Sequence, residues 1–265
     1  MNWSAVDASI LLPAFLAGLL VLATHVPLGI RVLNKGIVFI DLAIAQIAGL
    51  GVIVAGLMEI EPGGWQVQVA AALAALAGSL LLTWTERKWP EVQEAQIGVV
   101  FVLAATGGIL LLAKNPHGGE YLRDLLAGQI LWVGYRQLVV PLAVSVLTLA
   151  VLWGGRERLP QLVFYVVFAV AVTASVQLIG VYLVFASLIV PALGARRLAP
   201  RARLLVAYAT GALGYGAGLV LSSALDLPSG ALIVWCLAAL AIAAYAATRG
   251  RLSKQPARAG AAGPS

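Results

Sequence analysis

A few ionisable side chains lie inside long apolar stretches of this sequence, where burying them has a cost. Asp41 lies in the second turn of an apolar segment that begins near residue 37. Because a charge near the centre of a bilayer costs about 2.5–3.5 kcal/mol on insertion scales, such a carboxylate is a candidate functional group. We interpret Asp41 either as a cation or proton site facing a helix bundle, or as a carboxylate near the membrane surface that pairs with Lys35.

Three more polar side chains are candidates to bind a cation with Asp41. His25 precedes Pro27 and Gly29 in the first apolar segment, and histidine is the commonest metal-binding side chain. Glu94 opens a later segment, where stabilisation by the helix dipole is an alternative role for a carboxylate. Gln46 comes five residues after Asp41, so about 140° separates the two side chains on a regular helix.

Several enzyme signatures are missing from the sequence. Cys236 is the only cysteine, so the chain can form neither an internal disulfide nor a cysteine-cluster metal site. There is no GxxxxGK[ST] phosphate loop, no GxSxG turn and no HExxH pair. We therefore expect a chain that is not an enzyme and binds neither ATP nor another cofactor itself.

The composition predicts the environment in which these residues lie. Only 11% of the 265 residues are charged and 62% are hydrophobic, whereas a soluble domain has about 25% charged residues. Lipid therefore faces most of the molecule. The formal charge of +6 does not indicate nucleic-acid binding, because the basic residues lie in short connections between apolar runs.

The apolar runs predict an all-α, polytopic transmembrane bundle with eight or nine segments, since each crossing needs about 20 apolar residues. The segments are expected near 9–31, 37–58, 66–85, 94–113, 137–153, 161–179, 181–195, 203–222 and 230–248. Only Gly180 separates 161–179 from 181–195, so this pair is either two crossings or one crossing and a half-helix. One transmembrane domain over residues 1–252 and a disordered tail over 253–265 are expected.

The distribution of basic residues predicts the orientation. If the N-terminus is outside and the nine segments alternate, fourteen of the seventeen basic residues lie on the cytoplasmic side. Lys114, Arg123 and Arg136 are the three on the outer side. Because basic residues resist translocation, we predict an outer N-terminus and a cytoplasmic C-terminus in the cell inner membrane.

Five stretches in order resemble the permeases of metal-type ABC transporters, an integral-membrane family that handles zinc, manganese or iron. They are KGIVFIDLAIAQIAGLGV (35–52), EAQIGVVFVLAATGGILLLAK (94–114), DLLAGQILWV (124–133), SVQLIGVYLVFASLIVPALGARRLA (175–199) and LDLPSGALIVW (225–235). The fourth and fifth stretches are the most specific. Together they cover most of the chain.

The resemblance implies a transport function and its partners. It implies a homodimer of permease chains in the lipid bilayer, a cytoplasmic ATP-binding subunit that carries the ATP, and a periplasmic solute-binding protein. A divalent metal would be the imported substrate, moved by alternating access. Two other readings of the residues remain: an ATP-independent, ion-coupled carrier with Asp41 as its ion site, and a membrane interaction subunit that transports nothing.

The chain departs from the family pattern at two places. Family members usually carry an Asp and a His four residues apart on the second helix, whereas here Leu42 and Gln46 occupy those places and Asp41 comes one residue early. Oxygen ligands from Asp41 and amides suit a harder cation than zinc. The connection at 154–162 is also shorter than in the family; its Arg156, Glu157 and Arg158 are the expected ATPase contact, unless the docking element lies elsewhere.

Overall fold

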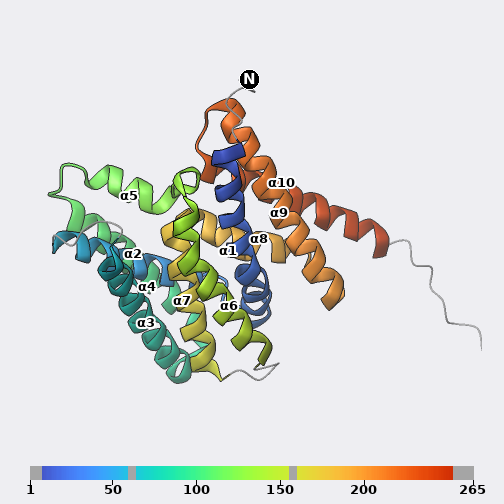
Figure 1. The fold of residues 1–265 in the computed structure, drawn as a ribbon. Helices are drawn as coiled ribbons and strands as arrows, with labels where there is room; N and C mark the ends of the chain where they lie inside the picture. Colours follow the sequence, from blue (N-terminus) through green and yellow to red (C-terminus); the bar gives the residue numbers. More distant parts are fainter. Residues whose placement is uncertain (1–7, 59–63, 155–159, 253–265) are drawn as a thin grey trace, which may run out of the picture.

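The computed structural model describes residues 8–58, 64–154 and 160–252. These residues form ten α-helices and no strand. The helices are α1 (Ala8–Lys35), α2 (Ile40–Leu57), α3 (Trp65–Lys88), α4 (Gln93–Leu112), α5 (Gly118–Ala127), α6 (Val139–Gly154), α7 (Gln161–Ile179), α8 (Val181–Gly194), α9 (Pro200–Leu225) and α10 (Ser229–Leu252). Short 3-10 turns cover Pro90–Val92, Ile130–Trp132 and Tyr135–Leu138. Figure 1 shows the bundle from the side.

Eight helical segments are long and apolar enough to cross a membrane, which confirms the predicted all-α transmembrane fold. The ninth apolar segment is α8, with only 14 residues. At about 1.5 Å per residue α8 is about 21 Å long, less than the roughly 30 Å of a hydrocarbon core. Its length therefore fits the half-helix alternative for the pair around Gly180. The tail 253–265 and the connection around Arg156 lie outside the described residues.

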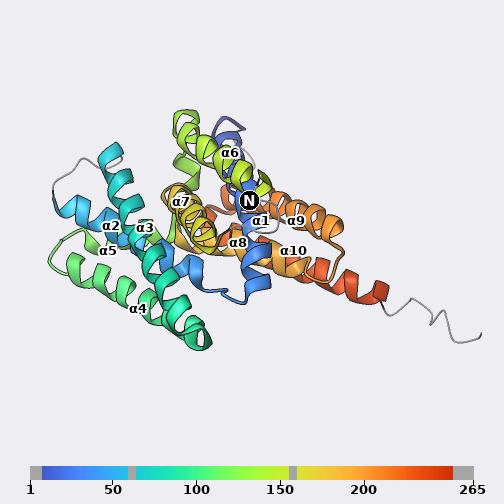
Figure 2. The same cartoon turned by 90° about the horizontal axis from the view of Figure 1, so that it is seen from below.

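The helices pack in two groups with α7 between them (Figure 2). In one group α2 packs against α3 and α4. In the other, α1 packs against α8 and α9, and α10 packs against α8 and α9. Since α7 contacts α2 and α3 as well as α6 and α8, it joins the two groups.

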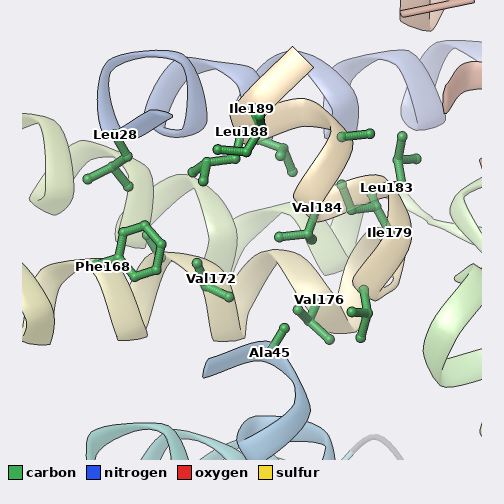
Figure 3. Packing of buried hydrophobic residues seen from close by; sticks show 14 of the residues in the cluster. Leu28, Ala45, Phe168, Val172, Val176, Ile179, Leu183, Val184, Leu188 and Ile189 are labelled. Carbon is green, nitrogen blue, oxygen red and sulfur yellow. The ribbon is translucent and has the colours of Figure 1, made fainter. Parts of the chain in front are cut away.

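The core around α7 and α8 is made of branched aliphatic and aromatic side chains (Figure 3). Phe168 and Val172 of α7 lie on the side of α8, and Val176 lies beside Ala45 of α2. All four are 3% exposed or less. Because this packing is dry, a polar side chain placed in it needs a partner or a function.

Three of the family-like stretches meet at a crossing of glycines. Gly128, which follows α5, and Gly180, between α7 and α8, both have positive φ angles, of 70° and 76°. A β-carbon on Gly128 would overlap the backbone of Ile179, and one on Gly180 would overlap the Ala127–Gly128 backbone. A β-carbon on Gly230, in the first turn of α10, would overlap the Ala127 carbonyl oxygen. The crossing therefore fixes where the half-helix α8 begins.

Candidate cation-binding site

Asp41 lies in the first turn of α2 and is only 1% exposed. Neither of its carboxylate oxygens has a well-formed hydrogen bond; the donors that approach them are the backbone N–H groups of Asp41 itself and Leu42. The alternative pairing with Lys35 is not formed, because the Lys35 Nζ lies over the Phe164 ring, 4.6 Å from its centroid. Asp41 is thus a buried carboxylate with unused acceptor capacity.

Glu94, in the first turn of α4, is the ionisable neighbour of Asp41. Its Oε1 accepts a hydrogen bond of 3.3 Å from the backbone N–H of Phe39, directly before α2. Its Oε2 is buried without a partner, and its side chain is near enough to Asp41 for the two carboxylates to interact. Glu94 therefore caps the neighbouring helix α2 rather than its own, and this contact brings the two carboxylates together.

The pair has three carboxylate oxygens without partners: both of Asp41 and Oε2 of Glu94. Two neighbouring carboxylates repel each other when both are ionised, and the buried Asp41 carboxylate requires a counter-charge when it is ionised. A bound divalent cation would supply that charge and use the free oxygens. The arrangement can therefore bind a cation through oxygen ligands.

Gln46 lies on a different side of α2. It shares a helical face with Leu50 and Ile53, which pack beside Gly107 and Gly108 of α4. Because α2 is an uninterrupted α-helix, the angular separation of Asp41 and Gln46 expected from the spacing is kept. The structure does not bring Gln46 onto the Asp41 face.

His25 is completely buried in α1 and bonds within its own helix. Its Nδ1 lies 3.0 Å from the Val21 carbonyl oxygen and 3.0 Å from the Thr24 hydroxyl, and its Nε2 has no partner. It lies on the α1 face of Gly18 and Gly29, which pack against α9 and α8. In the part of the chain that the structure describes, no three His, Cys, Asp or Glu side chains gather closely enough to hold a metal.

The structure adds a polar contact that the sequence interpretation did not include. The Tyr165 hydroxyl, on α7, donates a hydrogen bond to the Glu86 carboxylate in the last turn of α3. A sequence signal for this contact existed, because a carboxylate at a helix C-terminus is unfavourable with the helix dipole and so needs a donor nearby.

Discontinuous helices and ionisable side chains inside a helical membrane bundle are features of many membrane transport proteins. The chain belongs to the ABC 3 transport family, which matches it over residues 7–159 and 154–248. This match confirms the resemblance seen in the five sequence stretches and places the chain among transporter permeases.

Three similar proteins extend this result. The high-affinity zinc uptake system membrane protein ZnuB of Haemophilus influenzae is 22% identical over 252 residues, covering 87% of this chain and 95% of that protein. An uncharacterised membrane protein of Synechocystis is 27% identical over 243 residues, covering 83% and 84%. PsaBC from Streptococcus pneumoniae, solved in complex with Fab, has the same fold, with a TM-score of 0.73 at 18% identity over 92% of this chain and 95% of that one.

Proposed function

We propose that this chain is the membrane-spanning permease subunit of an ABC transporter that imports a divalent metal ion by alternating access. Membership of the ABC 3 transport family supports the transport class, and the zinc uptake function named for the Haemophilus influenzae relative supports a metal as substrate. The observation that carries the proposal for this chain is the buried Asp41 beside the partly buried Glu94, with three unpartnered oxygens between them.

The chemistry of this pair favours a hard cation. Carboxylate oxygens suit manganese and ferrous iron, whereas tight zinc sites use histidine nitrogens and cysteine sulfurs. His25 bonds within α1, and Cys236 is only partly buried in α10. We therefore infer a preference for manganese or iron over zinc, with Asp41 and Glu94 as ligands on this chain.

The proposal includes three protein partners and a defined orientation. A second copy of the chain would form the dimeric pore, a solute-binding protein would deliver the metal, and an ATP-binding subunit would carry the ATP that drives the cycle. The excess of basic residues on one side supports insertion in the cell inner membrane with the N-terminus outside and the C-terminus in the cytoplasm.

The contact with the ATP-binding subunit has two candidate positions. Arg156, Glu157 and Arg158, the position expected from the sequence, lie outside the described residues. The turn between α8 and α9 offers a second one, because Arg196 and Arg197 are exposed there directly after the half-helix. Both arginines also stack on the Tyr245 ring of α10, at 5.4 and 4.4 Å from its centroid, so this turn is held in place.

The test is metal uptake into proteoliposomes that contain the chain with its ATP-binding subunit and solute-binding protein, with and without ATP. We expect ATP-dependent uptake of manganese or iron, and a loss of at least tenfold in Asp41→Asn and in Glu94→Gln. Asp226→Asn is the matched control, because this carboxylate is exposed at the end of α9 in a left-handed conformation that asparagine tolerates.

Each other result would point elsewhere. Uptake driven by a proton gradient and indifferent to ATP would show an ion-coupled carrier. A correctly assembled complex that moves no metal would show a subunit that transports nothing. Equal losses in Asp226→Asn and Asp41→Asn would remove the assignment of the site.

A further inference from the structure

The Tyr165–Glu86 hydrogen bond joins the end of α3 to the beginning of α7. Tyr165 is fully buried although it lies in the second turn of α7, and Glu86 is partly buried. In Figure 1 these two helix ends lie together at the lower end of the bundle. The side chains belong to segments 79 residues apart, so the bond closes this end of the fold.

Lys35 brings the end of α1 into the same contact. Its Nζ lies 4.6 Å from the centroid of the Phe164 ring and 5.7 Å from that of Tyr165. Gly36, with a φ of 75°, then turns the chain toward α2. We use the name Tyr165 latch for the group formed by Tyr165, Glu86 and Lys35.

The latch is directly connected to the carboxylate pair. Gln93 approaches the Tyr165 hydroxyl and donates a hydrogen bond of 3.3 Å to the Leu82 carbonyl oxygen of α3. The next residue is Glu94, whose Oε1 accepts a hydrogen bond from the Phe39 N–H directly before α2, two residues before Asp41. The same set of contacts thus joins the end of α1, the beginning of α2, the end of α3 and the beginnings of α4 and α7.

We propose that the Tyr165 latch is a gate that controls the access of water to Asp41 from this end of the bundle. With the latch formed, Asp41 is 1% exposed and Glu86 is occupied by the tyrosine hydroxyl. Breaking the bond loosens the contact between the end of α3 and the beginning of α7, and so admits water to the carboxylate pair.

This inference rests on the proposed function for the nature of the cation, but the gate is tested without any transport. The reporter is Ala45→Cys in a Cys236→Ala background. Ala45 is 1% exposed and lies one turn after Asp41, toward α7. The rate at which a water-soluble maleimide labels the reporter, in the complex held in nanodiscs, measures the access of water to the carboxylate pair.

We expect Tyr165→Phe, which removes only the hydroxyl, to raise the labelling rate about tenfold, equivalent to about 1.4 kcal/mol in the closed–open equilibrium. Glu86→Gln is also expected to raise the labelling rate. The double variant should label about as fast as either single variant, because all of them lose the same interaction. Tyr208→Phe is the matched control: its hydroxyl also bonds across helices, to the Ala23 carbonyl at 3.0 Å, away from the latch.

Labelling at the same rate in Tyr165→Phe, in Glu86→Gln and in the parent reporter would overturn the gate. So would equal acceleration in Tyr208→Phe, because that would show general loosening of the bundle. Because labelling needs neither metal nor ATP, its failure is distinguishable from failure of the proposed function.

Discussion

Replacing Gly128 by alanine should destabilise the protein through two separable effects. Gly128 has φ 70° and ψ 168°, a region of backbone space that is essentially restricted to glycine and costs other residues on the order of 1–3 kcal/mol. The added β-carbon would also overlap the Ile179 carbonyl group at the start of the half-helix, and forced overpacking adds about 1–3 kcal/mol. We therefore expect a total loss of about 2–6 kcal/mol.

Two other glycines separate these effects. Gly36 has a φ of 75°, and an added β-carbon there would meet open space, so Gly36→Ala measures the cost of a positive φ without a clash. Gly98 lies within α4, where an added β-carbon would meet open space. Gly98→Ala therefore introduces neither backbone strain nor a clash, and it should stabilise the helix by up to about 1 kcal/mol. The expected order of stability is Gly98→Ala, Gly36→Ala, then Gly128→Ala.

The assay is thermal unfolding in detergent, followed by the fraction of protein that still elutes as a single species after heating. Unfolding of membrane proteins is often irreversible, so the order of the apparent midpoints is compared at one heating rate. If Gly128→Ala is as stable as Gly98→Ala, the backbone crossing at Gly128 and Gly180 does not exist as described. If Gly128→Ala only equals Gly36→Ala, the contact with Ile179 is wrong.

The remaining predictions concern the polar residues. Manganese at 100 times its Kd should stabilise the parent chain by about 2.7 kcal/mol, measured as a rise in apparent Tm, and this rise should vanish in Asp41→Asn; an equal rise there would exclude Asp41 as a ligand. His25→Gln should leave metal uptake within twofold, because His25 bonds within α1, and a tenfold loss would bring it into the site. Tyr215→Phe should cost about 1 kcal/mol in thermal unfolding, because its hydroxyl lies 2.7 Å from that of Ser187 while Ser187 keeps its bond to Leu183; no loss would show that this buried contact contributes nothing.

The membrane fold was predictable because its signal is local. A run of about 20 apolar residues determines a spanning helix without reference to the rest of the chain, and the eight long segments agree with the structure on this basis. The amphipathic helix α5 was not expected, since its polar side chains place it outside the apolar runs. The sequence left two alternatives for the segment after Gly180, because they differ only in the length of that helix. The 14 residues of α8 fit the half-helix.

The composition of the site was less predictable, because it depends on contacts between distant segments. The sequence identifies Asp41 and Glu94 as candidates because both are carboxylates at the start of apolar segments. Only the fold shows that Glu94 caps α2 and lies beside Asp41. His25 was a candidate by residue type alone, and its hydrogen bonds are formed within its own helix. Tyr165 and Glu86 are ordinary residues near helix ends until the packing of α3 on α7 joins them.

The family-like stretches have two different structural roles: some pack backbones together, and one contains Asp41. The resemblance therefore informs about the fold more than about the transported ion. The most specific stretches contain Gly180 and Gly230, which meet Gly128 where backbones touch; substitution there is limited by packing, whatever the transported ion. The stretch that contains Asp41 instead departs from the usual Asp and His spacing, and it lies beside the unpartnered oxygens. The glycine crossing therefore carries the family's fold, whereas on the proposed function the choice of cation depends on Asp41 and Glu94, and the spacing around Asp41 is where this chain departs from the family.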